Sequence, residues 1–406
     1  MRIALAADGT RGDIHPMLAL ARGLARRGHH VLLCAPPNFA DDVARCGVDF
    51  HPVGTDVRVY LESRAEILHG GALVSLGEGQ RYLREHVGIQ MRELARAIEH
   101  ADWILGAGSQ FAASSVAELL GARYRMVAYC PSLLRSRDQT PFAVPRGELP
   151  RWVNRAAWWG VETLVRRGLG GAIDDARVSL GLAPARDIYR LLLGERPALA
   201  AEAILAPLAR DLECRVVRIG CLHPFEAEPL PPKLEAFLDA GDPPVYVGFG
   251  SMTDPDPEAA TRLVLDAVER AGVRAVLSQG WAGLGRAPLP EGVMLVGPVC
   301  HASLFARVLA VVHHGGAGTT TTAARAGAPQ ILVPHVVDQF HWAHRVRRLG
   351  LGPPAIARRR LSAERLAAAI GAVGDNEVLA ERAAELGARL RAELGARPDP
   401  ADLVLS

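Results

Sequence analysis

The stretch His313-His-Gly-Gly-Ala-Gly-Thr319 follows an apolar segment at residues 309–313, which we predict to be a strand, and precedes a segment with helical character. A glycine-rich turn between a strand and a helix is typical of a parallel, doubly wound sheet. Free backbone N–H groups and the positive end of the helix dipole make such a helix start a site for phosphate, to which His314 can also donate a hydrogen bond. The alternative is a tight turn whose glycines only let the strand and the helix pack closely.

The same alternation of short apolar strands and helices extends outward from this stretch. Predicted strands lie at residues 2–7, 30–35, 49–53, 103–107, 125–129, 245–248, 274–278, 294–296, 309–313 and 330–333. Buried parallel strands covered by helices on both faces predict an α/β fold. We therefore expect two doubly wound, Rossmann-like domains that face each other across a cleft.

Prolines mark the expected boundary between the two domains. Four prolines fall within residues 223–232, which indicates a stiff interdomain linker. We assign residues 1–222 to the first domain and residues 233–406 to the second, and we allow for the last helix packing back on the first domain. A chain of 406 residues is long enough for two cores of this kind.

Charge and composition exclude several classes of protein. The formal net charge is only +2, from 46 basic and 44 acidic residues, so nucleic acid is not an expected partner. The six cysteines form no C-x-x-C pair, which argues against a zinc site or a disulfide framework. We find no signal peptide pattern and no apolar run long enough to cross a membrane, and we expect a cytoplasmic protein without a transmembrane segment.

Two common nucleotide-binding patterns are missing. The lone lysine, Lys233, lies far from the glycine-rich turn, so the phosphate-binding loop of ATPases is not present. Near the N-terminus, Gly9-Thr-Arg-Gly12 lacks the third glycine of a dinucleotide fingerprint. We therefore expect neither ATP hydrolysis nor a nicotinamide or flavin cofactor.

Several motifs in a fixed order resemble those of family 1 glycosyltransferases, which use nucleotide diphosphate sugars and have the GT-B fold. The resemblance to the donor-binding signature rests on His314-Gly-Gly-Ala-Gly-Thr319, Arg325-Ala-Gly-Ala-Pro-Gln330, Val333-Pro334 and Asp338-Gln339. The bacterial antibiotic, macrolide and sterol branch has motifs similar to Gly9-Thr-Arg-Gly-Asp-Ile-His-Pro16, Phe249-Gly-Ser-Met252 and Ser278-Gln-Gly-Trp281. The resemblance covers nearly the whole chain.

On the donor side, the resemblance implies contacts to the diphosphate and to the sugar. The diphosphate would be held by Ser251, His314, Gly316, Ala317, Gly318 and Thr319. Asp338 and Gln339 would bind hydroxyl groups of the sugar, which suits a carboxylate that accepts paired hydrogen bonds and an amide that both donates and accepts them. The alternative for Asp338 is that it only caps the helix that follows.

On the acceptor side, the resemblance implies that Asp13 is the general base. Inverting transfer needs a base that removes the proton of the acceptor hydroxyl while its oxygen attacks the anomeric carbon. We expect a carboxylate at a helix start to stay ionised. Capping of the helix is the alternative role for Asp13, and His15 is a rival base.

The contacts to the nucleobase stay open. Positions that stack on the base and bind the ribose in relatives fall on Val296 and Thr322 here, so the choice between UDP and dTDP is not assigned. Candidate contacts to the donor or its base are Arg11, Gly12, Trp281 and Val299. For Trp281, a place in the hydrophobic core is the alternative.

Two segments of the first domain, residues 55–80 and 151–168, depart from the strand and helix pattern. In the second segment, Trp152 and Trp159 lie near one helical face together with Arg155. Such a face can line the acceptor pocket, for which Trp152 and Trp159 are our candidates, or make a peripheral contact with an anionic membrane surface. Packing at a domain edge is the third alternative.

These observations predict an inverting glycosyltransferase that moves one sugar from a UDP- or dTDP-sugar to a hydroxyl group of an apolar small molecule. Expected acceptors are a polyketide, macrolide or glycopeptide aglycone, or a sterol. We expect no cofactor and no metal, because the helix start and His314 would neutralise the diphosphate. The alternatives are a lipid-linked sugar transferase at the inner membrane face, a nucleotide-sugar epimerase, and a non-catalytic helper subunit that binds the donor.

Overall fold

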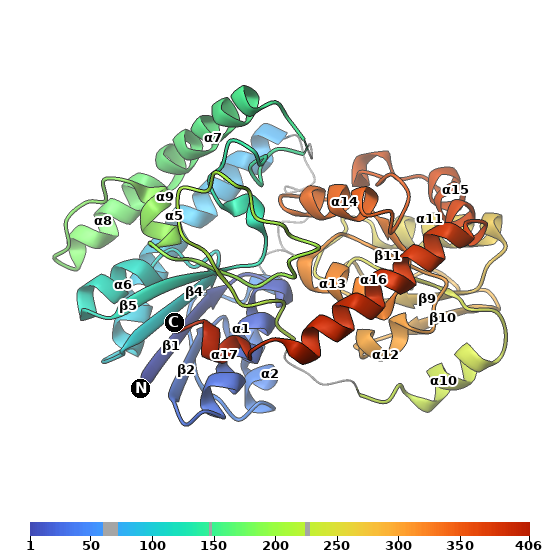
Figure 1. Ribbon diagram of the computed structural model, residues 1–406, viewed down its shortest axis with the longest axis horizontal. Helices are drawn as coiled ribbons and strands as arrows, with labels where there is room; N and C mark the ends of the chain where they lie inside the picture. The colour runs from blue at the N-terminus through green and yellow to red at the C-terminus, as the bar shows by residue number, and fades with distance from the viewer. Residues whose placement is uncertain (60–71, 146–147, 224–227) are drawn as a thin grey trace.

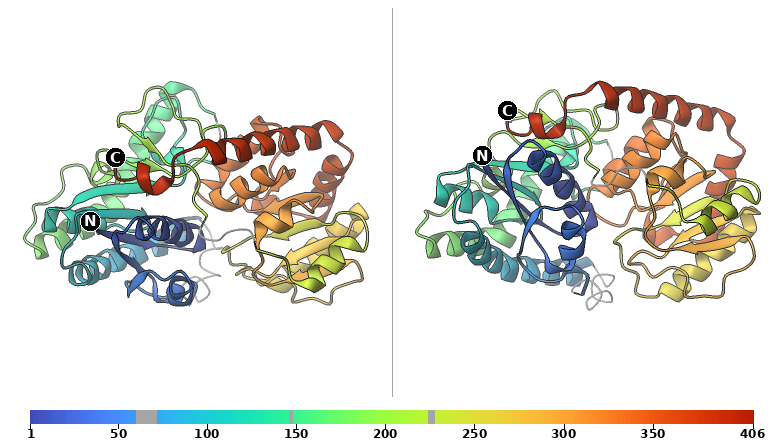
Figure 2. Two further views of the ribbon diagram at one scale, coloured as in Figure 1. Left: turned by 60° about the horizontal axis from the view of Figure 1, so that its bottom comes forward. Right: turned by 90° about the horizontal axis from the view of Figure 1, so that it is seen from below.

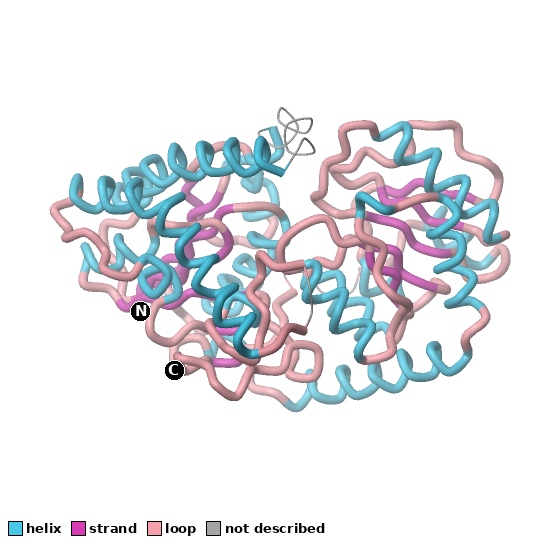
Figure 3. The backbone as a smooth tube through the Cα atoms, turned by 90° about the horizontal axis from the view of Figure 1, so that it is seen from above, coloured by secondary structure: helices cyan, strands magenta, loops and turns pink. Residues whose placement is uncertain are grey.

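Two parallel sheets, one in each half of the chain, organise the computed structural model, which describes residues 1–59, 72–145, 148–223 and 228–406 (Figure 1). The strands form two separate groups, each surrounded by helices (Figure 3). The strand pairs in the described residues are parallel. The predicted α/β fold with two doubly wound domains is confirmed.

The first sheet has seven strands in the order β3-β2-β1-β4-β5-β6-β7. Its strands are β1 (Arg2–Asp8), β2 (His30–Ala35), β3 (Asp49–Pro52), β4 (Trp103–Gly108), β5 (Arg123–Ala128), β6 (Ala198–Leu199) and β7 (Val217–Arg218). The last two strands have only two residues each, too few to show a pattern in the sequence, and they are absent from the predicted strands.

Helices cover both faces of the first sheet. They are α1 (Arg11–Ala25), α2 (Ala40–Ala44), α5 (Ala72–Ala97), α6 (Ala113–Leu120), α7 (Arg151–Val165), α8 (Gly171–Ser179) and α9 (Ile188–Leu193). Short 3-10 turns lie at Pro37–Phe39 and Pro131–Leu133, and a π-helical turn at Arg166–Gly170 follows α7. Of the interrupting segment at residues 55–80, residues 60–71 lie outside the described part of the chain.

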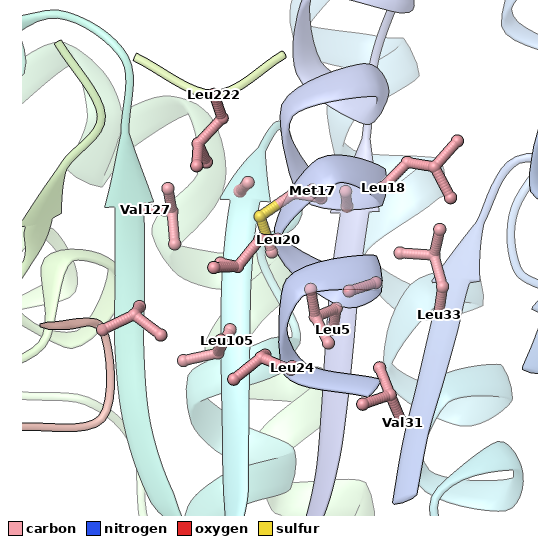
Figure 4. Close-up of a cluster of buried hydrophobic side chains, with 14 of the residues drawn as sticks. Leu5, Met17, Leu18, Leu20, Leu24, Val31, Leu33, Leu105, Val127 and Leu222 are labelled. Atoms are coloured by element: carbon pink, nitrogen blue, oxygen red, sulfur yellow. The ribbon is translucent and has the colours of Figure 1, made fainter. Parts of the chain in front are cut away.

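The core of the first domain lies between α1 and the sheet (Figure 4). The helix contributes Met17, Leu18, Leu20 and Leu24, and the strands contribute Leu5, Val31, Leu33, Leu105 and Val127. Burying a side chain of this size contributes about 1.5–3 kcal/mol relative to leaving it exposed. Since these residues recur at helical spacing on one face, they fix α1 on the sheet, and with it the first turn of the helix.

The second sheet has five strands in the order β10-β9-β8-β11-β12. Its strands are β8 (Val245–Gly248), β9 (Ala275–Ser278), β10 (Val293–Val296), β11 (Ala310–His313) and β12 (Gln330–Leu332). The helices of this half are α10 (Pro232–Asp239), α11 (Pro257–Ala271), α12 (His301–Phe305), α13 (Ala317–Ala326), α14 (Gln339–Arg348), α15 (Ala363–Gly374), α16 (Glu377–Ala396) and α17 (Pro400–Leu403), with a 3-10 turn at Arg358–Arg360.

The two domains share a buried interface. An apolar cluster joins Leu199 and Leu205 of the first domain to Trp342, Val346 and other residues of the second. Within it lies a buried ion pair network in which Glu202 binds Arg325 of α13 and Arg397. Of the predicted interdomain linker at residues 223–232, residues 224–227 lie outside the described part of the chain.

The C-terminal segment returns to the first domain. Figure 2 shows α16 running from the second domain toward the first, where α17 lies beside α1. Ala401 and Val404 are buried in the core of the first domain. Arg27 binds Asp402, and Arg125 donates to the carbonyl oxygens of Val404 and Ser406.

Candidate active site

Asp13 lies in the first turn of α1, directly after the carboxyl end of β1. Thr10 is the N-cap of the helix, and its hydroxyl accepts a hydrogen bond from the Gly12 N–H at 3.3 Å. In return the Asp13 carboxylate accepts hydrogen bonds from the Thr10 N–H at 2.8 Å and from the Thr10 hydroxyl at 3.4 Å. This capping box is the alternative role considered for Asp13, and it also fixes where the carboxylate lies.

Two glycines make room for the Asp13 side chain. A Cβ atom on Gly9, which has φ +132°, would lie 2.3 Å from Asp13 Oδ2. A Cβ atom on Gly108, at the end of β4, would lie 2.9 Å from the Asp13 Cβ. Either addition would displace the carboxyl group, so the backbone at the ends of β1 and β4 is shaped around it.

The place of Asp13 at a helix start favours its ionised form, but burial of the carboxyl acts in the opposite direction. Burial raises the pKa of the Asp13 carboxyl to about 7, against the opposing hydrogen bond from the Thr10 N–H. Asp338 and Asp8 raise the pKa further, because both are like charges. A carboxylate with a pKa near neutrality is a stronger base than one at its ordinary value, and it still ionises at physiological pH.

Asp8, Gln90 and Tyr129 also belong to this site and are not among the residues predicted from the sequence. Asp8 is 4% exposed, and its carboxylate accepts a hydrogen bond at 2.5 Å from the amide of Gln90 in α5. The hydroxyl of the partly buried Tyr129 donates to the carbonyl oxygen of Asp13 at 2.7 Å. Gln90 and Tyr129 reach the site through tertiary packing of elements that are distant in the sequence, so no local signal marks them. Asp8 directly precedes Gly9 in the sequence, but no local signal shows its burial.

His15, the rival base, has another partner. Its Nε2 lies 3.0 Å from the carboxylate of Asp42 in α2, and the ring makes an edge contact with Phe39. The hydrogen bond with His15 lowers the pKa of Asp42 below its ordinary value. The pair links α1 to α2, whereas the Asp13 carboxylate lies against the backbone at the ends of β1 and β4.

The glycine-rich turn of the second domain leads from β11 into α13. His313 is fully buried, and its Nδ1 accepts a hydrogen bond from the Gly315 N–H while its Nε2 binds the side chain of Gln330. Gly316 is the N-cap of α13 and supplies no side-chain cap. The N–H groups of Ala317, Gly318 and Thr319 therefore begin the helix without a side-chain cap, as an anion site at a helix N-terminus requires.

His314 lies beside these N–H groups and is neutral. Burial lowers the pKa of His314 to about 3, with the neighbouring His335 and His301 contributing. The ring packs against Gly250 and Gly316, where a Cβ atom would lie 2.9 Å and 2.5 Å from it. Its Nδ1 is buried and has no hydrogen-bond partner among the residues that the structure describes. Ser251, also buried, follows Gly250 in the turn after β8.

Asp338 and Gln339 lie at the start of α14. Asp338 makes no capping hydrogen bond, which rules out the simple N-cap interpretation, and it accepts instead from the Trp342 indole at 3.3 Å. Burial raises the pKa of Asp338 to about 6. The Gln339 amide oxygen accepts from the N–H groups of His335 and Val336 at 2.7 and 3.1 Å, so this residue holds the preceding turn.

The turn before Asp338 is strained. Val337 has φ +41°, the one non-glycine residue with positive φ in the described chain. A β-branched residue in this region costs of order 1–3 kcal/mol, and such strain persists where the surroundings dictate it. The two hydrogen bonds to Gln339 supply that constraint, and they place the Asp338 carboxyl at the interdomain junction.

The remaining candidate contacts lie in different environments. Trp281 is 8% exposed, and its backbone N–H donates to the Gly250 carbonyl oxygen at 2.9 Å, which joins its loop to the turn after β8. Val299 is partly buried against the core of the second domain. Arg11 and Gly12 are exposed on the first turn of α1, next to Asp13.

The packing interpretation of the two candidate acceptor-binding tryptophans is wrong. Trp152 and Trp159 are 76% and 72% exposed, and α7 forms an outer edge of the first domain (Figure 1). The core position belongs to Trp158, whose indole donates to the Gln139 carbonyl at 3.0 Å. The face with the two exposed tryptophans and Arg155 therefore has no packing function inside the domain.

One Asp-x-Asp sequence occurs in the chain, at Asp254-Pro-Asp256, and its two carboxylates have protein partners. Asp254 pairs with Arg358, and Asp256 caps α11 by accepting from the Ala259 N–H at 2.9 Å. These carboxylates therefore serve the local structure of the second domain.

Comparison with known proteins shows the family. Residues 3–93 match the model of the glycosyltransferase family 28 N-terminal domain, and residues 262–406 match the C-terminal domain described as erythromycin biosynthesis protein CIII-like. The chain is 38% identical over 358 residues to glycosyltransferase GtfE of Amycolatopsis orientalis, which covers 87% of this chain and 85% of the relative. The chain belongs to the family 1 glycosyltransferases.

This glycosyltransferase has further relatives with two kinds of named acceptor. It is 38% identical over 357 residues to the vancomycin aglycone glucosyltransferase of Amycolatopsis orientalis, with 87% of this chain and 85% of the relative covered. It is 30% identical over 399 residues to sterol 3-beta-glucosyltransferase UGT80B1 of Arabidopsis thaliana, with 91% and 62% covered. The resemblance to the antibiotic and sterol branch is thereby confirmed.

Solved structures confirm the GT-B fold of the glycosyltransferase. The kitacinnamycin glycosyltransferase superposes with a TM-score of 0.70 at 21% identity, covering 99% of this chain and 96% of the other. The calicheamicin glycosyltransferase CalG4 gives 0.70 at 19% identity, covering 99% and 97%. The named relatives are sugar transferases, which leaves the epimerase, helper and lipid-linked alternatives without support. Among the described helices, none is long and apolar enough to cross a membrane.

Proposed function

We propose that this glycosyltransferase transfers a sugar, with inversion, from a dTDP- or UDP-sugar to a hydroxyl group of a large apolar aglycone. The observation that carries the proposal is the pair of helix starts, one in each domain: the start of α1 fixes the Asp13 carboxylate, and the glycine-rich start of α13 has no side-chain cap. It supports a reaction centre at which a base from one domain meets a donor diphosphate bound by the other.

In the proposed reaction, Asp13 takes the proton of the acceptor hydroxyl. The acceptor oxygen forms a bond to the anomeric carbon as the bond from that carbon to the diphosphate oxygen breaks on the opposite face. The nucleotide diphosphate leaves with the bonding electrons. The capping box and the Tyr129 hydrogen bond support this role, because they hold Asp13 in place before the acceptor binds.

The donor diphosphate binds, in this proposal, at the uncapped start of α13. The N–H groups of residues 316–319 and the Ser251 hydroxyl would donate to its oxygens, and the neutral His314 would donate through one ring nitrogen. Asp338 would accept hydrogen bonds from sugar hydroxyls, and Gln339 would hold the turn that carries it while offering its remaining amide hydrogen. Arg11, Gly12 and Val299 stay candidates for the nucleoside end.

The names of the relatives support the substrate classes. One relative, 36% identical over 359 residues, is named dTDP-epi-vancosaminyltransferase, which supports a thymidine diphosphate donor. The vancomycin aglycone and sterol transferases support a bulky, largely apolar acceptor. Since the glycopeptide relatives are the more similar, we place a glycopeptide or macrolide-type aglycone before a sterol.

Three further features complete the proposal. The enzyme acts without a metal, because the helix start and His314 stabilise the leaving diphosphate. It acts in the cytoplasm, where nucleotide sugars are its substrates. The exposed face of α7, with Trp152 and Trp159, binds the acceptor. Glu148, just before α7, pairs with Arg348 of α14, which supports a position of this helix near the junction of the domains.

A transfer assay with the purified chain tests the proposal. Vancomycin aglycone is incubated with a panel of dTDP- and UDP-sugars, with and without EDTA, and products are detected by mass and by the anomeric configuration in NMR. We expect one glycosylated product, of configuration opposite to the donor, formed equally with EDTA. Retained configuration would contradict inversion, and activity lost with EDTA and restored by Mg²⁺ would contradict the metal-free mechanism.

Donor binding can be tested without knowing the acceptor. A ligand at 100 times its Kd stabilises the folded state by about 2.7 kcal/mol, so a thermal-shift screen of nucleotide sugars ranks donors directly. We expect dTDP-sugars to give the largest shifts. Absence of any shift with both nucleotide classes would contradict the proposed donor site.

A further inference from the structure

Residues 201–206 of the first domain, which follow β6, contact both helices at which the donor is proposed to bind. Arg325, in the last turn of α13, binds the Glu202 carboxylate. Arg345 of α14 donates to two backbone carbonyl oxygens of the same segment, at 2.8 and 3.0 Å. The diphosphate and the sugar are assigned to the starts of these helices. This segment, which we call the anchor segment, therefore contacts each helix beyond its donor-binding end.

Glu202 is the centre of these contacts and is 7% exposed. Besides Arg325, its carboxylate accepts from Arg397 at 2.9 Å and from the Cys221 N–H at 3.1 Å. Burial acts to raise the pKa of Glu202, but Arg397 and Arg325 hold this pKa below its ordinary value. One ionised carboxylate of the first domain thus binds two arginines of the second.

The two arginines reach Glu202 from closely packed backbone. A Cβ atom on Gly387 of α16 would lie 2.8 Å from the Cα atom of Gly327, which ends α13. A Cβ atom on Gly220 would lie 1.7 Å from a guanidinium nitrogen of Arg397. Because α13 and α16 pack without a side chain between them at this point, they present the two arginines to Glu202 as one unit.

The anchor segment is also joined to the element that supports the base. Arg218 of β7 donates to two backbone carbonyl oxygens of the segment, at 3.0 and 2.9 Å. The segment continues from β6, which pairs with β5, and β5 leads to Tyr129. The Tyr129 hydroxyl donates to the Asp13 carbonyl oxygen at 2.7 Å. A continuous series of contacts therefore connects Asp13 to α13 through Glu202.

Helix geometry carries a movement at Arg325 to the proposed diphosphate site. Arg325 lies in the last turn of α13, a helix of 10 residues. At 1.5 Å per residue, such a helix is about 15 Å long. A tilt at its last turn displaces the first turn relative to the first domain, and a misplacement of about 1 Å lowers a rate by up to about 10²-fold.

We propose that Glu202 is a positioning residue for the reaction: by binding Arg325 and Arg397, it fixes the orientation of the second domain and so sets the distance from the donor at α13 to the Asp13 carboxylate. The inference rests on the proposed function, which assigns the base to Asp13 and the diphosphate to the start of α13. Glu202 makes no bond to the substrates and transfers no proton.

The test is Glu202→Gln, which keeps the shape of the side chain and an oxygen for the Cys221 N–H but removes the charge. We expect kcat per folded molecule to fall about tenfold, because the reacting groups are misplaced. The Kd of dTDP, measured by calorimetry, should not change, since the proposed diphosphate site lies within the second domain. An unchanged kcat would overturn the proposal, and so would an equal loss of dTDP binding, which would show damage to the donor site instead.

Glu118→Gln is the matched control. It makes the same substitution in a carboxylate that pairs at 2.9 Å with the buried Arg177 inside the first domain. Its kcat should stay unchanged, and a tenfold loss here would show that Glu202 has no special role. If Glu202→Gln does not fold, Arg397→Gln takes its place, because it leaves the pair of Glu202 and Arg325 intact. It should lower kcat about threefold with the Kd of dTDP unchanged.

A second measurement does not depend on sugar transfer. Residual dipolar couplings of backbone N–H groups report the orientation of the two domains in the full chain. We expect one alignment tensor to fit both domains of the unmodified protein and of Glu118→Gln, and separate tensors to be needed for Glu202→Gln or Arg397→Gln. A common tensor in these last variants would overturn the role of Glu202. If the protein transferred no sugar at all, the proposed function would fail, and the couplings would still decide whether Glu202 fixes the domains.

Discussion

The first turns of α1 and α13 occupy equivalent places in the two domains, but only the first turn of α1 has a side-chain cap. Both helices begin directly after a buried strand, at the carboxyl edge of a parallel sheet. At α1, Thr10 and Asp13 cap the helix reciprocally, whereas α13 begins at Gly316 without a side-chain cap. The capped turn fixes a carboxylate, and the uncapped turn leaves backbone donors for an anion, so the two domains offer complementary halves of one reaction centre.

The largest expected effect comes from removing the carboxylate of the capped turn. Asp13→Asn should lower kcat by about 10²–10⁴, because general-base catalysis contributes a factor of this size. Binding of dTDP, measured by calorimetry, should stay within a few-fold, because the donor binds mainly at the other turn. Turnover near that of the unmodified enzyme would reduce Asp13 to a helix cap and direct attention to His15.

A substitution in the uncapped turn should weaken donor binding, whereas the substitution in the capped turn lowers kcat. His314→Ala should weaken binding of dTDP by roughly 10–150-fold, since a hydrogen bond to a charged group contributes about 1.5–3 kcal/mol. Thymidine, which lacks the diphosphate, serves as the control and should bind almost as before. Small and equal losses for the two ligands in calorimetry would place His314 outside the phosphate site.

The pH dependence of sugar transfer should follow the ionisation of Asp13 in the capped turn. Asp13 must be ionised to accept a proton, and the pKa of its carboxyl in the free enzyme is about 7, so kcat/KM should rise with pH through about 7. One pH unit below the midpoint, kcat/KM should be about a tenth of its plateau. Steady-state rates between pH 5 and 9 test this, and a midpoint near 4 would show that burial does not govern the base.

Loss of the Thr10 cap should lower the free energy of unfolding. Thr10→Ala removes the acceptor of the Gly12 N–H, and loss of a threonine cap costs about 1 kcal/mol in the free energy of unfolding. Thr319→Ala is the matched variant in the first turn of α13, where no side-chain cap exists, and we expect a change within about 0.5 kcal/mol. Urea denaturation of both variants measures the difference, and equal losses would contradict it.

The smallest stability effect is expected outside both turns, on the exposed face of α7. Trp159→Ala should change the free energy of unfolding by less than about 0.5 kcal/mol while raising the acceptor KM. Trp158→Ala is the control, because loss of this buried ring should cost about 3–5 kcal/mol. An unchanged KM combined with salt-sensitive flotation on anionic vesicles would assign the face to a membrane contact.

The sequence predicts best what is encoded locally. Both strand, turn and helix units are predictable, because glycines, an apolar strand and a helical repeat lie within twenty residues at Arg2–Asp8 and around His314. The two-residue strands β6 and β7 exist only through pairing with β5 and each other, so no pattern marks them. Strands that form only through such pairing cannot be predicted from a local sequence pattern.

The surroundings of the site residues depend on contacts between residues that are far apart in the sequence, so they cannot be predicted from local patterns. Gln90 lies 82 positions from Asp8, and Asp338 lies in the other domain from Asp13. The helix start that favours the ionised form of Asp13 is local, whereas the burial that raises the pKa of its carboxyl to about 7 is tertiary, so the sequence does not predict this pKa. The role of Gln339 in holding the turn before α14 likewise depends on a backbone conformation that the sequence does not reveal.

The return of the C-terminal segment to the first domain has a consequence for biosynthesis. Ala401 and Val404 complete the core under α1, and Arg125 binds the backbone of Val404. On the ribosome, the domain that is made first therefore waits for residues that are made after the second domain. We expect the nascent first domain to expose the apolar surface beside α1 while the second domain is still being translated, which makes this surface the natural point for chaperone binding.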